Sequence, residues 1–268
     1  MLDFIFDYSE SGRWKKPFAA HDVGTYPLAN GQTYQGDMPV EETGNMLIMT
    51  TAIAIADGNA DYAAKHWEIL TAWSNYLAEA GMDPENQLCT EDFAGHLAHN
   101  ANLSAKAIMA IAGYGRLAEM LNKPEEAKKF TEMAKRMAIE WERRADDGDH
   151  YRLAFDMPGT WSQKYNFVWD KVLGLNILPD RIMKKEVTFY LKTQNKYGLP
   201  LDNRFTWGKT DDTVWSATMA DSEGDFQELI RPIWKYVNET SSRVPLGDWY
   251  ETSVSYTHLR AHETTLHL

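Results

Sequence analysis

Apolar positions recur at helical spacing along most of the chain, and they predict two kinds of helix in alternation. The segment 41–57 is apolar nearly all round, which is typical of a helix that is covered on both sides. The segment 61–80 follows a tight connection and carries a single apolar stripe, as expected of a helix with one face in solvent. The predicted unit is therefore a hairpin of one buried helix, a short turn and one amphipathic helix.

Further copies of this hairpin follow along the chain, pairing 103–121 with 127–141, 164–176 with 182–191, and 212–220 with 225–238. Pro232 falls inside the last predicted helix and should kink it or mark its start. Strand-like alternation is essentially absent. Repeated helical hairpins predict an all-α fold, an incomplete (α/α)6 toroid, since a full ring of hairpins needs about a dozen helices.

The connections between successive hairpins are long, and they cover 12–38, 81–102, 148–163, 197–209 and the region from 241 onward. In a ring of hairpins these connections leave from the same end, because each joins an amphipathic helix to the next buried one. Loops longer than about a dozen residues within a compact domain are usually functional. Because they also concentrate Trp, Tyr, His, Asp and Asn, we expect the functional site at this end.

Length and composition place residues 1–252 in one domain. From 253 to 268 the composition changes and resembles translated adapter sequence, so we interpret these residues as a non-native tail and build no metal site on its histidines. The first residues of the chain also resemble the end of a secondary-structure element. We therefore expect the domain to be truncated at both ends. No cofactor is indicated.

A net charge of -12 excludes broad binding to nucleic acid, whose affinity comes largely from Lys and Arg. No apolar run reaches the length of about 18 residues that a membrane-spanning helix needs. The single cysteine, Cys89, excludes an internal disulfide. The expected partner is therefore a small molecule or a saccharide.

Carboxylates in the first long connection and just after it are candidates for catalysis. Asp22, beside His21, is either a general acid or base, or a turn residue that accepts hydrogen bonds from its own backbone. Glu41 and Glu42 lie in the first turn of a predicted buried helix, where one acid suffices to complement the helix dipole. We therefore favour a catalytic role for one of the two glutamates.

Asp92 lies in the middle of the second long connection, four residues before His96. An acid, a base and polar orienting groups within a few residues fit hydrolysis, although solvated side chains explain the same pattern. Our mechanistic hypothesis is that Asp92 and one of Glu41 or Glu42 activate water, with Asp22 as the next candidate.

Substrate-binding candidates fall in the long connections. Arg204 either holds a substrate carboxylate with both arms of its guanidinium or pairs with Asp202. Aromatic rings in these loops either stack on sugars, line a pocket or pack in the core. The full set of candidates is Trp14, His21, Tyr34, His96, Trp161, Asp202, Arg204, Trp207, Asp248 and Trp249.

Six strings carry a resemblance to a known family: HDVGTYP, MPVEETGNMLIM, QLCTEDFAGHLAHNANL, WSQKYNFVWDKVLGLN, YGLPLDNR and VPLGDWYET. In this order, over roughly 2–252, they closely resemble the six-hairpin domain of the glutaminase A family. The resemblance implies an (α/α)6 toroid of the six-hairpin glycosidase type and hydrolysis of glutamine to glutamate and ammonia. It also implies export and further domains of the parent chain on the N-terminal side.

Three functions remain open from the sequence. A glutamine amidohydrolase is favoured by the resemblance. A glycoside hydrolase predicts two carboxyl groups about 5–9.5 Å apart across a cleft. A non-catalytic carbohydrate-binding toroid predicts aromatic residues without such a pair.

Overall fold

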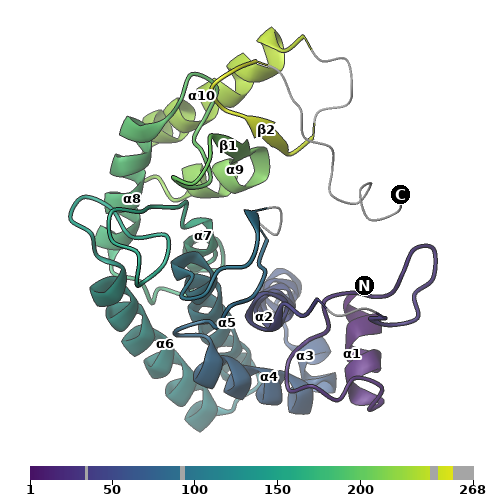
Figure 1. Cartoon of the computed structure of the whole chain (residues 1–268). Helices are drawn as coiled ribbons and strands as arrows, with labels where there is room; N and C mark the ends of the chain where they lie inside the picture. Colours follow the sequence, from purple (N-terminus) through teal and green to yellow (C-terminus); the bar gives the residue numbers. More distant parts are fainter. Residues whose placement is uncertain (34–35, 91–93, 242–246, 256–268) are drawn as a thin grey trace. The chain divides into compact units, whose positions relative to one another are not determined.

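Helices make up most of the chain that the computed structural model describes, which comprises residues 1–33, 36–90, 94–241 and 247–255. The chain divides into two units, each described here by itself. Unit 1 comprises 1–143 and 169–178, and unit 2 comprises 144–168 and 179–268. Figure 1 shows the elements in chain order, from α1 in purple to β2 in yellow.

Unit 1 holds the first two predicted hairpins. Its helices, including most of α6 and α7, are α1 (Leu2–Glu10), α2 (Pro39–Asp57), α3 (Asp61–Lys65), α4 (Trp67–Ala80), α5 (Ala101–Met120), α6 (Pro124–Ala145) and α7 (Val168–Val172). The helix predicted over 61–80 is interrupted at His66, whose φ of -115° and ψ of 22° leave the helical region, so α3 and α4 are separate.

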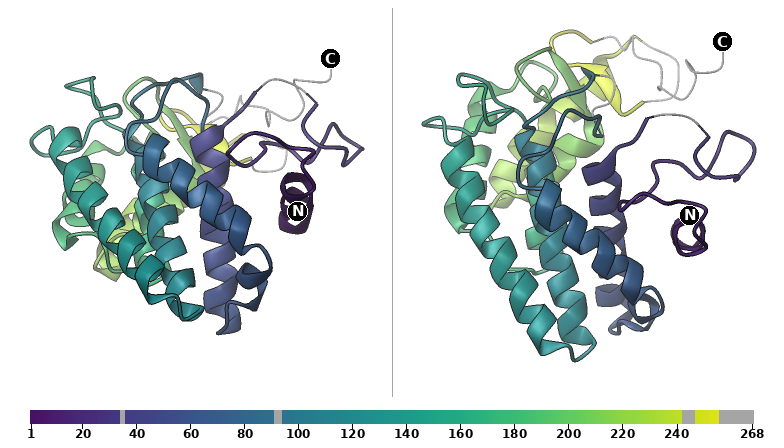
Figure 2. Two further views of the ribbon diagram at one scale, coloured as in Figure 1. Left: turned by 90° about the horizontal axis from the view of Figure 1, so that it is seen from below. Right: turned by 60° about the horizontal axis from the view of Figure 1, so that its bottom comes forward.

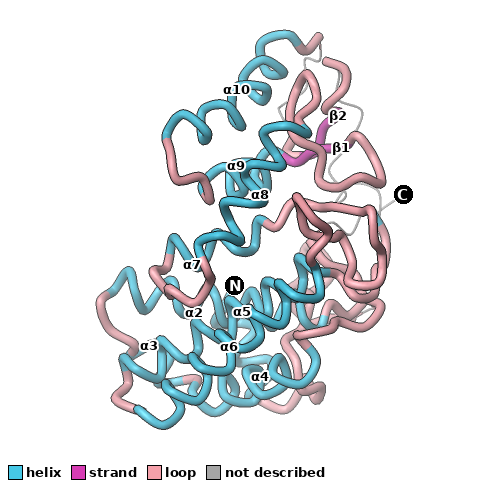
Figure 3. The backbone as a smooth tube through the Cα atoms, turned by 90° about the vertical axis from the view of Figure 1, so that its left-hand side faces the viewer, coloured by secondary structure: helices cyan, strands magenta, loops and turns pink. Residues whose placement is uncertain are grey.

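The buried helices α2 and α5 pack side by side and form the centre of unit 1 (Figure 3). Small residues permit this contact, because a Cβ added at Gly113 of α5 would lie only 2.6 Å from Thr51 Oγ1 on α2. The amphipathic helices cover this pair. The indole of Trp141 on α6 donates a hydrogen bond to the Ala101 carbonyl at 2.7 Å, which fixes α6 against the start of α5.

Long and short connections of unit 1 lie at opposite ends of its helices. Figure 2 shows the turns at 58–60 and 121–123 at one end, and the described parts of the connections, 12–33, 36–38, 81–90 and 94–100, toward the other. The N-termini of α2 and α5 share the second end, where the Val40 N–H donates to Gln87 Oε1 at 2.9 Å. The predicted gathering of long connections is thus present in unit 1.

The helix predicted over 164–176 is shorter than expected. The structure places a 3-10 turn, η2 (Tyr165–Phe167), before α7, which ends at Val172. Gly174 and Asn176 adopt φ of 62° and 56°, a left-handed conformation that ends helices. The apolar pattern in the sequence continues past Val172, but the helical backbone conformation ends there.

Unit 2 contains η2, α8 (Asp180–Thr193), β1 (Trp207–Lys209), α9 (Thr210–Thr218), α10 (Glu223–Glu239) and β2 (Trp249–Glu251). Pro232 lies inside α10 and does not mark its start. The strands β1 and β2 pair antiparallel, with Gly208 opposite Tyr250. Strands of three residues are too short to show alternation in the sequence, so this small sheet adds a detail to the all-α fold that the apolar pattern did not indicate.

Three tyrosines and an isoleucine form a core cluster that includes strand β2, in which Tyr197, Ile233, Tyr236 and Tyr250 are buried together. The Tyr250 hydroxyl donates to the Tyr197 carbonyl at 3.0 Å, which connects β2 to the connection before β1. The sheet therefore holds 197–209 in place, the predicted long connection that carries several candidate residues. In the described part of the chain, none of the helices combines the length and apolarity needed to cross a bilayer.

Candidate functional site

The first turn of α2 places a buried ion pair at the end of unit 1 where the long connections lie. Glu41 on α2 pairs with Lys106 on α5, and both side chains are almost fully buried. Glu41 Oε1 also accepts hydrogen bonds from Thr90 Oγ1 at 2.6 Å and from Asn45 Nδ2 at 3.3 Å. Lys106 Nζ further donates to Asn45 Oδ1 at 2.8 Å. The two charges and the two polar side chains form one connected network, named the Glu41 network below.

Charge in this network settles the protonation of Glu41. Burial raises the pKa of Glu41, but the neighbouring Lys106 charge and hydrogen bonds outweigh it and hold the pKa below its ordinary value. Glu41 is therefore ionised near neutral pH. A general acid needs a raised pKa, so this carboxylate is unsuited to that role.

Gly44 allows Lys106 to reach Glu41 across the helix contact. A Cβ at this position of α2 would lie 2.7 Å from Lys106 Cγ and 3.0 Å from its Cδ. Since Lys106 is buried, its aliphatic chain has little room to move aside. Gly44 is thus required by the close approach of a side chain rather than by its own backbone conformation.

Glu42, the next residue, has different surroundings. Its Oε1 lies 3.1 Å from His21 Nδ1, and its Oε2 accepts from Asn45 Nδ2 at 3.2 Å. The side chains of Glu42 and His21 are 21% and 26% exposed, so solvent reaches both. Asn45 contacts both glutamates and links this pair, named the Glu42–His21 pair below, to the Glu41 network. The structure thus brings together His21, Glu41 and Glu42, three of the predicted residues.

Asp22 and Trp14 take part in local structure. Asp22 Oδ1 accepts from the Gly24 N–H at 3.0 Å, as a turn-forming aspartate does. The Trp14 indole donates to the Phe18 carbonyl at 2.5 Å and its ring packs near Tyr8. These contacts support the structural alternatives for both residues, and their roles at a site stay predictions.

Two candidates, Asp92 and Tyr34, lie outside the described residues. His96 is described and is exposed. The part that Asp92 and His96 play in hydrolysis therefore stays a prediction.

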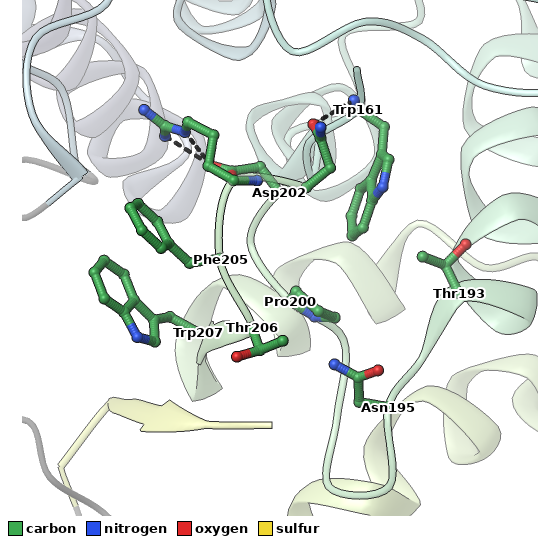
Figure 4. A pocket seen from close by; sticks show the side chains of 10 residues that line it. Trp161, Thr193, Asn195, Pro200, Asp202, Phe205, Thr206 and Trp207 are labelled. Atoms are coloured by element: carbon green, nitrogen blue, oxygen red, sulfur yellow. Dashed lines mark hydrogen bonds and ion pairs between the residues drawn. The ribbon is translucent and has the colours of Figure 1, made fainter. Parts of the chain in front are cut away.

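Unit 2 has a surface pocket of its own, with a volume of about 470 Å³ (Figure 4). Four predicted substrate-binding residues line it, namely Trp161, Asp202, Arg204 and Trp207. They come from two connections, 148–163 and 197–209, which a bridge between Ser162 and Asp202 joins. The structure therefore brings together residues that are about forty positions apart in the chain, a grouping that follows from loop pairing within one unit.

Arg204 pairs with Asp202 in this pocket, which was one of the two predicted alternatives. Arg204 Nε and Nη2 donate to Asp202 Oδ2 at 3.0 and 2.6 Å, as the dashed lines in Figure 4 mark. The Arg204 backbone N–H donates to the other carboxylate oxygen at 2.7 Å. The carboxylate thus engages the guanidinium, and the pair is close to neutral overall.

Asp248 and Trp249 lie at the strand beside this pocket. Asp248 Oδ2 is 3.3 Å from Lys209 Nζ, and Asp211 and Asp212 lie within 4 Å of the same ammonium. Burial lowers the pKa of Lys209, but these three carboxylates outweigh it and raise the pKa to about 12. Lys209 is therefore a permanent cation held by acids, and Asp248 serves as one of its partners.

The sequence interpretation overlooked Lys106, Thr90 and Asn45. A signal for Lys106 was present, because it is the one basic residue within the apolar first half of the predicted helix 103–121. Which carboxylate it would meet depends on the contact between α2 and α5. No cluster of three or more His, Cys, Asp or Glu side chains suited to a metal ion occurs among the described residues.

Comparison with known proteins identifies the family. The model of the glutaminase A six helical-hairpin domain matches residues 1–264. This chain belongs to the glutaminase A six helical-hairpin domain family. The membership confirms the resemblance carried by the six strings and agrees with the all-α fold.

Two curated relatives carry glutaminase names. Glutaminase A of Aspergillus oryzae is 34% identical over an alignment of 259 residues, with 94% of this chain and 37% of that protein covered. A protein of Arthroderma benhamiae named "Probable glutaminase" is 26% identical over 340 residues, with 94% of this chain and 39% of that protein covered. The chain thus spans well under half the length of these members of the glutaminase A family.

Proposed function

We propose that this domain takes part in the hydrolysis of L-glutamine to glutamate and ammonia, with the Glu42–His21 pair as the reacting groups. The names of the two relatives support the substrate. The observation that carries the choice of residues is the contact between Glu42 Oε1 and His21 Nδ1 at 3.1 Å, on two partly exposed side chains. Carboxylate and imidazole in contact are a common arrangement for general acid–base catalysis.

Glu42 suits this role better than Glu41. Glu41 Oε1 is surrounded by Thr90, Asn45 and Lys106, and its side chain is only 4% exposed. Glu42 has no lysine partner among the described residues and remains open to solvent. The Glu41 network then serves to fix the first turn of α2, from which Glu42 projects.

The proposed chemistry needs one proton acceptor and one donor. The Glu42 carboxylate holds the His21 imidazole, which accepts a proton from water while the water oxygen attacks the side-chain amide carbon of glutamine. The C–N bond then breaks as the imidazolium returns the proton to the departing nitrogen, which leaves as ammonia. Asp92 stays a predicted second carboxylate for this step. Further domains of a longer parent chain and export from the cell also remain proposals.

Ammonia release from glutamine by the 268-residue chain tests this function. We expect Glu42→Gln and His21→Ala each to lower kcat by a factor of about 100 or more, the usual contribution of a positioned acid or base. Glu68→Gln is the matched control, because Glu68 is an exposed glutamate of α4 in the same unit.

A panel of aryl glycosides run beside glutamine separates the alternatives. Sugar release without ammonia would overturn the glutaminase proposal in favour of a glycosidase. Full ammonia release by Glu42→Gln would keep the reaction but remove the Glu42–His21 pair from it.

A further inference from the structure

A stack of aromatic rings forms one wall of the pocket in unit 2. The rings of Phe205 and Trp207 lie parallel, with centroids 3.9 Å apart and an interplanar angle of 15°. Trp249 meets Trp207 edge-on at 5.4 Å. Phe205 ends the stack and is 48% exposed. Rings that are backed from behind and open in front offer a flat apolar face to a ligand.

Trp161 offers a second ring at the same pocket. Figure 4 shows it on the other side of the segment 200–207 from Phe205 and Trp207. Its ring meets Phe189 edge-on at 5.5 Å, and its backbone exchanges hydrogen bonds with Asn203 at 2.9 and 3.2 Å. Contacts of both its ring and its backbone therefore fix the position of Trp161. A ligand that crosses this segment would meet an aromatic ring on each side, which suits an extended molecule better than a small enclosed one.

Charges in the pocket are cancelled. Arg204 Nη2 lies 2.6 Å from Asp202 Oδ2, so the guanidinium and the carboxylate neutralise each other's charge. A free amino acid such as glutamine carries both an ammonium and a carboxylate, and each needs an opposite charge that is not already engaged. The charge balance of this pocket therefore favours a neutral ligand.

Polar groups that remain available in the pocket include both donors and acceptors. Within the described part of the chain, no hydrogen bond occupies Asn195 Oδ1, Asn203 Nδ2 or Trp161 Nε1, although all three residues line the pocket. Hydroxyl groups donate and accept at once, so they satisfy such a mixture. Aromatic faces, cancelled charge and mixed polar groups together match a neutral polyhydroxylated chain.

The geometry points to a binding site for a neutral oligosaccharide in unit 2, with Trp161 and Phe205 as its stacking surfaces. This site lies outside the proposed glutaminase chemistry and does not rest on it. Saccharide binding here needs no hydrolysis and involves no residue of the Glu42–His21 pair.

Isothermal titration of the whole chain with tetrasaccharides tests the site. The probes are maltotetraose, cellotetraose, mannotetraose and chitotetraose, and L-glutamine serves as the charged comparison. We expect at least one tetrasaccharide to bind with a Kd of about 1 mM or tighter. Trp161→Ala and Phe205→Ala should each weaken that binding by about tenfold, because each removes one stacking face.

Trp234→Ala is the matched control, since Trp234 is a 68% exposed tryptophan on α10 of the same unit and does not line the pocket. Its binding should equal that of the unchanged chain. Glu42→Gln should also bind the saccharide normally, which separates this test from that of the proposed function.

Three results would overturn the site. One is no binding of any tetrasaccharide up to about 10 mM. Another is binding that survives both Trp161→Ala and Phe205→Ala in variants whose circular dichroism shows them folded. The third is a heat signal for glutamine that these two substitutions abolish, which would assign the pocket to the amino acid instead.

Discussion

Each unit contains a buried lysine–glutamate pair, and the two pairs differ in how the charges meet. In unit 1, Lys106 donates directly to Glu41. In unit 2, Lys164 Nζ remains 3.9 Å from Glu186 Oε2 and donates instead to the Ser162 carbonyl at 2.8 Å and the Tyr151 carbonyl at 3.1 Å. The Glu186 carboxylate therefore lies too far from Lys164 for a direct hydrogen bond and is stabilised less by the lysine charge than Glu41 is by Lys106.

The pKa values of the two glutamates move in opposite directions. Burial raises the pKa of Glu186, and neither Lys164 nor the hydrogen bonds from Tyr190 and the Tyr151 N–H restore it. Burial acts on Glu41 too, but the direct contact with Lys106 carries its pKa below the ordinary value. Burial alone therefore does not set the protonation of a carboxylate, and direct contact with a counter-charge decides it.

The largest expected effect comes from breaking the closer pair. Glu41→Gln leaves the Lys106 ammonium buried without its counter-charge, which should lower the free energy of unfolding by about 3–5 kcal/mol. Urea titration at neutral pH measures the loss. Glu68→Gln, at an exposed glutamate of the same unit, should change stability by less than about 0.5 kcal/mol. A loss equal to this control would show that the Glu41–Lys106 contact adds nothing.

Gly44→Ala tests the Glu41–Lys106 pair by pushing the Lys106 side chain aside while both charges remain. The new methyl group would lie 2.7 Å from Lys106 Cγ, so we expect a loss of about 1–3 kcal/mol from overpacking. Gly224→Ala in α10 is the matched control, because its new methyl group would lie in ordinary contact with Ser222 Oγ, at 3.7 Å. That variant should be neutral or slightly stabilised. Equal stability of the two variants would contradict the tight approach of Lys106.

Glu186→Gln should have a smaller effect than Glu41→Gln. The charged form of Glu186 is already disfavoured by burial, so removing its charge loses little Coulomb attraction. The amide nitrogen does, however, replace an oxygen that accepts from Tyr190 or from the Tyr151 N–H. We expect a loss of about 1–2 kcal/mol in the same urea titration, the usual result of one buried group left unsatisfied. A loss larger than that of Glu41→Gln would reverse the comparison.

The pH dependence of these two losses should have opposite signs. The lowered pKa of Glu41 gives stabilisation that is present above the unfolded value of 4.5 and disappears as the pH falls, so the Glu41→Gln penalty should shrink toward acid. The raised pKa of Glu186 gives stabilisation that is present below 4.5 and disappears as the pH rises, so its penalty should shrink toward neutral pH. Neither slope should exceed about 1.4 kcal/mol per pH unit. Parallel slopes in the two variants would contradict the assigned directions.

Much of the helical architecture could be predicted from apolar spacing. The predicted segment 41–57 corresponds to α2, and 103–121 corresponds to α5, because fully buried helices carry an unmistakable excess of apolar residues. The interruption at His66 and the early end of α7 were not predicted, since local backbone conformation decides them while the apolar pattern continues. The strands β1 and β2 exist only through pairing with each other, which no local pattern encodes.

Residue types at the two candidate sites were also visible in advance, but their partners were not. Glu41 and Glu42 stand out as adjacent acids in the first turn of a predicted buried helix. Trp161 and Trp207 stand out as large aromatic residues in long connections, which often carry functional residues. The sequence spacing could not decide whether the Arg204 guanidinium binds a ligand carboxylate or the Asp202 side chain, because both arrangements use the same guanidinium group.

The sequence by itself determined the all-α class, the hairpin repeat and the family, since apolar periodicity and the six strings are properties of the chain alone. The tertiary structure decided which glutamate is buried against lysine and which stays open beside His21. Adjacent positions on a helix point about 100° apart, so neighbours in the chain face different surroundings. Only the packing of α2 against α5 assigns those surroundings to Glu41 and Glu42.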